Sequence, residues 1–456
     1  MRKPFANSPD ALAVGVSRIR AVQSPGELSL GHWGRCRNAP TTPTETFGRN
    51  RHAHHRCFCS RRCSPASSQA VSLTVCNPAG RETACNDTIL ASSSGTAVDF
   101  PRADTETIEA AGDGLEAFNA LFLARGWGDG LPLVPPTPER VKAMLAGYDL
   151  PDDFPIATLP PLDGVATVGK IAVNAVMAGC EPRHMPLLVA AGEAVSQPEF
   201  DLRGVATTTN PDSVLVIVSG PIVKRLGINA GTNTFGRGNR ANACIGRALH
   251  LIISNVGGSR PGITDMSTLG QPGDFAMFLA ENADASPWPS FHTEYGFLPE
   301  RNVVTVAAVE GYSGIMGIGY SRPEYLDLIA AWLRGHDRPY RRSIILLVAQ
   351  DTAQMLAREG WTREAMRQYI RERARIPFGE WNRQYHGAKE ARKGVPEEVF
   401  SIADPNELVD KPFFDSMPII VAGGTGEKSM LLPCWASGKM VSQEIRLPAS
   451  WGEGVR

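Results

Sequence analysis

The 456-residue chain lacks the features that would place it at once among membrane or nucleic-acid-binding proteins. No stretch approaches the roughly 18 consecutive apolar residues that a membrane-spanning helix needs, and the most apolar runs, VLVIVSGPIV and SIILLVA, have the length of strands. The formal net charge is −1 and charged residues make up only 20% of the chain, which argues against a general nucleic-acid binder. We therefore expect a small molecule as the partner, with neither nucleic acid nor membrane.

The motifs of the common cofactors are missing too. Neither G-x-G-x-x-G nor G-x4-G-K-[ST] is present, so the sequence predicts no nucleotide site. H-E-x-x-H is absent as well, and no metal site is predicted. The segment HAHHRCFCSRRC contains zinc-ligand side chains, but in the spacing C-x-C-x3-C and without a second pair at zinc-finger distance. These side chains are His54, His55, Cys57, Cys59 and Cys63. The sequence identifies no cofactor.

Cysteine is scarce beyond the first 104 residues, which contain six of the nine. Only Cys180, Cys244 and Cys434 remain in the later part, and three scattered thiols suit a reducing compartment better than a disulfide framework. We therefore expect a cytoplasmic protein. The two parts also differ in charge. Residues 1–85 contain 12 Lys and Arg against 4 Asp and Glu, a balance of +8, and the remainder contains 34 against 43, a balance of −9.

Residues 1–104 are interpreted as a disordered basic leader. They are rich in Arg, Ser, Thr, Pro and Ala and show no sustained hydrophobic period. This composition is typical of an organelle transit peptide, which would change the expected location. It is equally typical of upstream sequence that an over-long gene model has translated.

Beyond the leader, the hydrophobic pattern predicts an α/β fold with a largely parallel or mixed sheet flanked by helices. The β-branched segments SVLVIVSGP, NVVTVAAVEG, RSIILLVAQD and MPIIVAGGTG have the pattern of strands, and helical patterns lie between and around them. The order of these elements is compatible with two related lobes. We place an N-terminal α/β lobe at residues 105–298 and a C-terminal α/β lobe at residues 299–456.

The segment GWGDGLPLVPPT, residues 126–137, joins two predicted helices. Its glycines permit backbone angles closed to other residues, and its prolines fix an extended chain. Two interpretations remain open. The segment is either a rigid joint in which Trp127 fills a gap, or the wall of a substrate pocket that holds Asp129 in place.

Substrate-binding residues are predicted in a loop that follows a strand and precedes a helix. The helix N-terminus and its arginines favour anions, and the loop is rich in Asn and Gly, which also form ordinary self-stabilised turns. The candidates here are Asn229, Asn233, Asn239, Arg240 and Arg247. Lys428, in the glycine turn AGGTGEKS, is a further candidate for a shared anion-binding pocket.

Four residues are candidates for catalysis. Cys244 lies near the start of a predicted helix, where the helix dipole lowers a thiol pKa. Cys180 precedes His184 by four residues, and a Cys–His pair can generate a thiolate. Glu281 and His292 are general acid and base candidates. The alternative for each cysteine is a small buried residue.

Seven segments together carry a family resemblance. They are GWGDGLPLVPPT, KIAVNAVMAGC, GPIVKRLGIN, GRALHLIISNVGG, TLGQPGDF, AENADASPW and VAGGTGEKSMLLP. In these segments the chain resembles a bacterial family associated with UGSC-motif (seleno)proteins, some labelled thioredoxin-like, over about Leu115 to Pro448. The resemblance implies a thiol-based redox role. It assigns no catalytic residue, because neither U-G-S-C nor C-G-S-C is present.

Three functions stay open at this point. The first is an enzyme that acts on a small polar or anionic organic molecule by thiol-linked redox chemistry. The second is a hydrolase or lyase that uses Glu281 and His292. The third is a non-catalytic protein of ligand binding or assembly. The glycine-rich, low-charge body is compatible with a homo-oligomer.

Overall fold

A computed structural model describes eight stretches of the chain. They are residues 70–79, 105–111, 113–335, 343–385, 401–409, 417–435, 437–449 and 451. By contacts between residues the chain divides into Met1–Ala66 and Ser67–Arg456, so every described residue belongs to the second unit. The histidines and cysteines of the zinc-like segment lie outside the described residues.

An antiparallel hairpin begins the described chain. It pairs β1 (Ala70–Cys76) with β2 (Thr105–Ala111). The prediction of disorder is therefore wrong for residues 70–76, whereas most of the leader lies outside the described residues. Val75 and Cys76 are buried, and the Cys76 N–H donates to the carbonyl oxygen of Pro136. The strand is stabilised by partners far along the chain, which its own pattern does not reveal.

Helices follow as the sequence predicts, and a second hairpin, which the sequence did not indicate, lies among them. Thr137 caps α2 by accepting a hydrogen bond from the Arg140 N–H, and the side chain of Asp113 caps α1 in the same way. The elements before the main sheets are α1 (Gly114–Ala124), α2 (Pro138–Leu145), β3 (Pro155–Leu159), β4 (Gly164–Thr167), α3 (Val168–Ala178), η1 (Pro182–His184), α4 (Met185–Val195), η2 (Pro198–Phe200) and α5 (Leu202–Val205).

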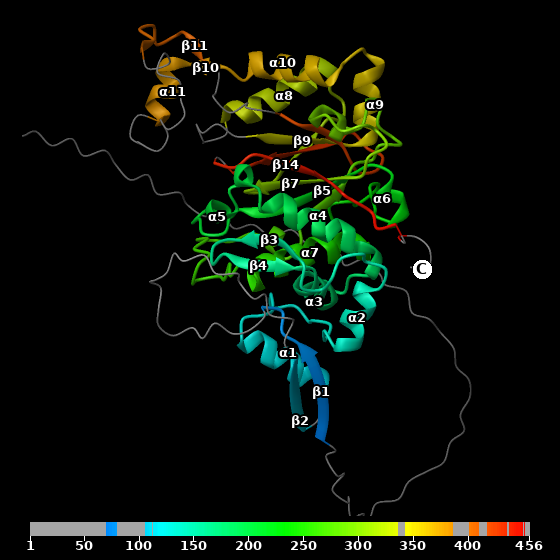
Figure 1. The fold of residues 1–456 in the computed structure, drawn as a ribbon. Helices are drawn as coiled ribbons and strands as arrows, with labels where there is room; N and C mark the ends of the chain where they lie inside the picture. Colours follow the sequence, from blue (N-terminus) through cyan, green and yellow to red (C-terminus); the bar gives the residue numbers. More distant parts are fainter. Residues whose placement is uncertain are drawn as a thin grey trace, which may run out of the picture. The chain divides into compact units, whose positions relative to one another are not determined.

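Two four-stranded mixed sheets form the centre of this unit (Figure 1). The first has the order β14 (Val441–Glu444), β7 (Val303–Val309), β5 (Ser213–Ser219), β6 (Phe278–Ala280). The second has the order β8 (Ser313–Met316), β13 (Lys428–Pro433), β9 (Ile344–Val348), β12 (Ile419–Val421). The four predicted strands are β5, β7, β9 and β12, so these predictions are confirmed.

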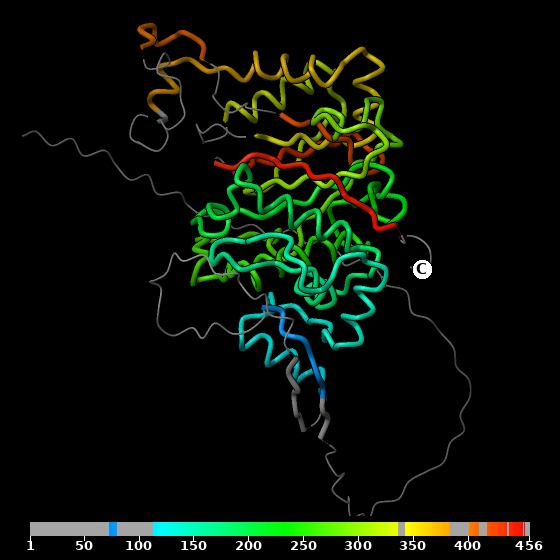
Figure 2. The backbone as a smooth tube through the Cα atoms, viewed as in Figure 1, coloured from blue at the N-terminus to red at the C-terminus, as the bar shows by residue number. Residues whose placement is uncertain are grey.

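The two sheets share one topology. In each, an edge strand runs parallel to its neighbour, and the two following pairs are antiparallel. The sheets also exchange their fourth strands: β8 follows β7 in the chain but pairs with β13, and β14 follows β13 but pairs with β7. Figure 2 shows residues 441–444, in red, returning to the green strands. β7 lies after residue 299 and pairs with β5, so the sheets do not divide at that residue.

Helices cover the outer faces of the two sheets, and the inner faces pack together. Alternation along β5 shows this arrangement. Val214, Val216 and Val218 belong to a core that includes α3, α4 and α7 (Arg240–Asn255), whereas Leu215 and Ile217 join the core between the sheets. β9 alternates in the same way beneath α8 (Arg322–Gly335), α9 (Gln350–Arg358) and α10 (Arg363–Arg373). Burial on both faces explains the uninterrupted apolar runs of these strands.

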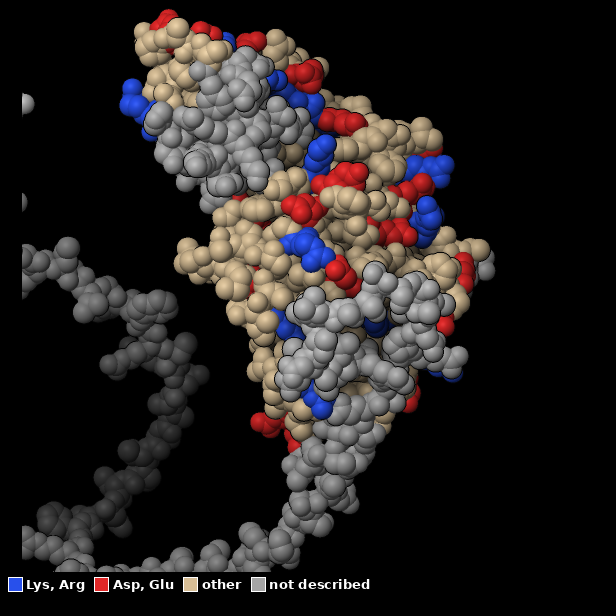
Figure 3. Space-filling model, turned by 60° about the vertical axis from the view of Figure 1, so that its left-hand side comes forward, with Lys and Arg blue, Asp and Glu red and all other residues tan. Residues whose placement is uncertain are grey.

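The predicted α/β fold with a mixed sheet is therefore confirmed. The remaining elements are short and lie in the connections. They are α6 (Ile222–Arg225), η3 (Pro272–Asp274), η4 (Phe291–Tyr295), β10 (Ile376–Pro377), α11 (Phe378–Tyr385) and β11 (Leu408–Val409). Within the described part of the chain, no helix is both long enough and apolar enough to cross a membrane. On the face in Figure 3, acidic and basic side chains are interspersed.

Candidate functional site

The turn between α1 and α2 packs against α7. Trp127 is buried, and its ring meets Phe122 edge to face at 5.1 Å between centroids. The backbone carbonyl of Trp127 accepts a hydrogen bond from Asn255 Nδ2 at 3.1 Å. The structure thus places Trp127 as a filler of the joint, away from solvent.

Asp129 forms a two-point ion pair with α7. Arg247 Nε lies 2.6 Å from Oδ2 of Asp129, and Nη2 lies 2.8 Å from Oδ1. The same guanidinium donates to the carbonyl oxygens of Leu131 and Pro132. Both charged side chains are largely buried, with exposed fractions of 14% and 16%. Arg247 therefore holds the turn on the helix, and the pair leaves little of its charge for a substrate.

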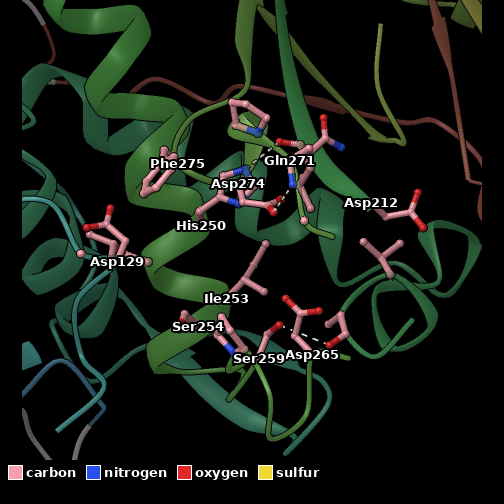
Figure 4. A pocket seen from close by; sticks show the side chains of 18 of the residues that line it. Asp129, Asp212, His250, Ile253, Ser254, Ser259, Asp265, Gln271, Asp274 and Phe275 are labelled. Carbon is pink, nitrogen blue, oxygen red and sulfur yellow. Dashed lines mark hydrogen bonds between the residues drawn. The ribbon is translucent and has the colours of Figure 1, made fainter. Parts of the chain in front are cut away.

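A cavity of about 690 Å³ opens beside this turn (Figure 4). Residues 128–130 form one part of its wall, α7 another, and residues in the range 259–275 the rest, together with α5 and the start of β5. In Figure 4, Asp129 and Asp212 lie at opposite edges, and Asp274 lies near Gln271 and His250. The volume suits a small organic ligand.

The charge of this cavity is negative. Asp129, Asp212, Asp265 and Asp274 line it, and among the described residues no lysine or arginine does. Asp129 is neutralised by Arg247, and Asp265 and Asp274 contribute further carboxyl groups to the lining. Much of the remaining wall is apolar. A lining of this kind favours a ligand with cationic or hydrogen-bond-donating groups on an apolar body.

The pKa of the Asp274 carboxyl group is raised above its ordinary value. Burial raises the pKa of its carboxyl group, and the nearby charge of Asp265 adds to this effect. The backbone N–H of Gln271, which donates to Asp274 Oδ2 at 3.2 Å, acts in the opposite direction. A carboxyl group with a raised pKa can keep its proton nearer to neutral pH and donate it.

His250 lies in the α7 wall of the cavity. Its Nε2 lies 3.1 Å from the carbonyl oxygen of Val214, and since a carbonyl can only accept, this nitrogen carries the proton. Burial lowers the pKa of the imidazole to about 4. The ring is therefore neutral at pH 7, and Nδ1 can accept a proton or a hydrogen bond.

Cys180 and Cys244 lie close together. A Cβ placed on Gly179 would be 3.5 Å from Cys244 Sγ, and Cys180 is the next residue. The sequence predicts a lowered pKa for Cys244. Instead, burial raises the pKa of Cys180 and of Cys244, although Arg240 lowers both. Cys244 is the fifth residue of α7, beyond the turn where the helix dipole is strongest.

Arg240 fixes the same corner. Its Nε donates to the carbonyl oxygen of Gly179 at 3.1 Å, and its Nη1 lies 3.3 Å from Oε1 of Glu181. His184, the predicted partner of Cys180, instead accepts the Glu181 N–H at Nδ1. Burial lowers the pKa of His184 to about 4, so a neutral imidazole stands at this position.

The predicted substrate-binding asparagines hold their own loop. Asn239 caps α7 by accepting the N–H of Asn242 at 3.0 Å, and the Asn229 N–H donates to Asn242 Oδ1 at 2.9 Å. Asn233 adopts a positive φ of 61° and donates to the carbonyl oxygen of Arg237. Of these, Asn233 also lines a second, smaller cavity with Lys428. The loop does not line the acidic cavity.

Glu281 and His292 are brought together, but in the interior. The Phe291 N–H donates to Glu281 Oε1 at 2.6 Å, and Arg363 Nη2 lies 3.7 Å from the same oxygen. Glu281 is 2% exposed and His292 0%. Burial raises the pKa of Glu281. The geometry is that of a buried charge cluster between α10 and the first sheet, so a catalytic role for the two residues stays a prediction.

Known proteins give no further guide to this site. No family model and no curated protein matches the chain. Among the described residues, no group of three or more His, Cys, Asp or Glu side chains could hold a metal ion. The function has to be inferred from the residues themselves.

Sequence reasoning missed most of the residues that line the acidic cavity. Of the 12 predicted site residues only Asp129 lines it. Asp274 belongs to TLGQPGDF, one of the segments that carry the family resemblance, but the resemblance assigned it no role. His250 likewise belongs to GRALHLIISNVGG, whereas Asp212 and Asp265 lie in no such segment, because the cavity brings together parts of the chain that are distant in sequence.

Proposed function

We propose that the protein is an enzyme that binds a small organic molecule with amine or hydroxyl groups in the acidic cavity and acts on it by proton transfer. The observation that carries this proposal is a ligand-sized cavity whose described lining has four aspartates and neither lysine nor arginine. The charge favours a cationic or neutral polar substrate over the anionic one that the Asn- and Arg-rich loop indicated.

Asp274 and His250 supply the proton chemistry in this proposal. The raised pKa of Asp274 favours its protonated form, and the pKa of about 4 keeps the His250 ring neutral with a lone pair. Two titratable groups whose pKa values are shifted in opposite directions are typical of the acid and base in hydrolases and lyases. This is the acid–base function expected from the sequence, carried by different residues.

A panel of matched probes tests the binding step. We expect cyclohexylamine and sorbitol to raise the thermal unfolding midpoint, and cyclohexane carboxylate to leave it unchanged. Asp265→Asn should weaken amine binding about tenfold, as for the loss of one charge-assisted hydrogen bond of about 1.4 kcal/mol. Asp284→Asn is the control, because Asp284 is exposed and pairs with Lys224 away from the cavity. Equal stabilisation by the carboxylate, or an equal loss in the control, would contradict the proposal.

A second candidate function is thiol-linked redox chemistry at Cys180 and Cys244. It is supported by the 3.5 Å approach of Cys244 Sγ to the Cβ position on Gly179, and it agrees with the proposed resemblance to the UGSC-motif group. Both thiols are free in the structure. The free thiols also support a cytoplasmic location, which we propose with it.

Glutathione disulfide distinguishes this second candidate. In the proposed reaction the two thiols give two electrons and two protons to one glutathione disulfide, which forms the Cys180–Cys244 bond and releases two glutathione molecules. We expect peptide mass spectrometry to find this bond in the wild type. The Cys244→Ser variant should instead retain glutathione on Cys180. A wild type in which neither cysteine reacts would exclude the chemistry.

A further inference from the structure

The smaller cavity, of about 440 Å³, lies where two distant segments meet. Residues 232–236, from the loop before α7, form one side, and residues 422–425 of the glycine turn together with residues 428–430 of β13 form the other. Tyr312, Leu347 of β9 and the following Ala349 complete it. This cavity shares no residue with the acidic one.

The two segments are fitted to each other. The Gly423 N–H donates to the carbonyl oxygen of Ala230 at 2.9 Å, and Asn282 Nδ2 donates to the Gly423 carbonyl at 3.1 Å. A Cβ on Gly424 would lie 2.0 Å from Oγ1 of Thr232 and 3.0 Å from its Cα. Only glycine allows this approach, so the walls of the cavity are held in a defined position.

The charge of this cavity is positive. Lys428 lines it, and no described aspartate or glutamate does. The nearest acidic residues of the turn are engaged elsewhere: Asp351 Oδ2 accepts the Gly426 N–H, and Glu427 Oε2 lies 3.7 Å from Nη2 of Arg322. Lys428 is exposed and forms no ion pair with any residue that the structure describes. Its ammonium group can therefore meet an anion from solution.

Other groups around Lys428 complement an oxyanion. Thr425 contributes a hydroxyl beside Lys428, whereas the N–H groups of Gly423 and Gly426 are already engaged within the protein. On the opposite side, Phe235 and Tyr312 pack edge to face at 5.9 Å between centroids. The two perpendicular rings form an apolar wall against which the face of a ligand ring can pack.

We propose that this cavity is a second binding site, for a small organic oxyanion, carboxylate or phosphate, that carries a flat ring. The anionic group lies at Lys428 and the glycine turn, and the ring lies against Phe235 and Tyr312. The site is independent of the proposed acid–base function, because it uses different residues and the opposite charge.

Titration of the full chain with benzoate and phenyl phosphate tests the proposal, with neutral benzamide as the comparison. We expect both anions to bind and benzamide not to bind. Lys428→Gln should weaken the binding of both anions about tenfold or more, as for a lost charge-assisted contact. Preference for phenyl phosphate or for benzoate identifies the oxyanion, and either result supports the site. Binding that also weakens as salt is raised agrees with a charged contact.

Two variants serve as controls for this test. Lys439→Gln removes an exposed lysine that does not line the cavity, and it should bind both anions as the wild type does. Asp274→Asn should do the same, because Asp274 belongs to the other cavity. Equal binding of benzamide, unchanged binding by Lys428→Gln, or binding of neither anion would overturn the proposal. An unchanged thermal midpoint of Lys428→Gln without ligand shows that the variant is folded.

Discussion

Replacing Asp129 with alanine is expected to lower the free energy of unfolding by about 3 kcal/mol, as for one partner removed from a buried ion pair. The change leaves the guanidinium of Arg247 largely buried without its carboxylate. It also removes the hydrogen bond from the Leu131 N–H to Asp129 Oδ1. Urea denaturation followed by circular dichroism measures the effect.

Asp163 offers the matched control. It pairs with Arg203 at 2.6 Å, but these side chains are 59% and 55% exposed. An exposed pair contributes about 0–1 kcal/mol, so Asp163→Asn, which also suits the positive φ of 56° at this position, should have a small effect. If the two variants lose equal stability, Asp129 does not hold the turn on α7, and the wall of the acidic cavity is not anchored as the structure indicates.

The second large effect is a loss of stability in mild acid. The pKa of His184 is lowered from 6.5 to about 4 in the folded protein, so between these values the unfolded chain binds more protons than the folded one. The resulting stability is fully present above pH 6.5 and is lost as the pH falls towards 4. For a shift of this size the loss is about 3 kcal/mol. Denaturation midpoints between pH 7 and pH 4 measure it.

The His184→Asn variant isolates this contribution. Asparagine keeps an acceptor for the Glu181 N–H, which His184 Nδ1 accepts at 3.1 Å, but it does not titrate. We expect the variant to lose less stability than the wild type over the same pH range. The pKa of His250 is also lowered to about 4, so His250 contributes part of the dependence of unfolding free energy on pH in both proteins. If the unfolding free energy of the two proteins changes equally with pH, the loss of stability in acid does not come from His184.

The strands and most helices could be predicted because their signals are local. β5 and β9 are apolar runs with glycine or polar residues at their ends, and Thr137 and Thr362 are threonines of the kind that cap helices, each accepting a backbone N–H at a helix start. The exchange of β8 and β14 between the sheets could not be predicted, since each pairs with a strand far along the chain. β1 was missed for the same reason.

In the candidate site, too, only the residues with a local sequence signal could be predicted. Asp129 stood out because the glycines and prolines around it predicted a rigid turn, and this turn does line a cavity. Asp274 and Asp265 are ordinary surface-loop residues in the sequence. The cavity that both residues line arises only when residues 259–275 fold over α7. The pKa of Cys244 was expected to fall with the helix dipole, and burial, which no local pattern reports, outweighs it.

Titration of cyclohexylamine into the wild type and Asp274→Asn, at several values between pH 5 and pH 8, tests the central claim most directly. The amine stays cationic throughout, so only the protein titrates. The wild type should bind it more tightly as the pH rises through the raised pKa of Asp274, because ionisation adds a negative charge to the cavity. Asp274→Asn should bind it with an affinity that changes much less with pH. Equal pH dependence in the two proteins, or no binding by either, would contradict the assignment of the acidic cavity as the functional site.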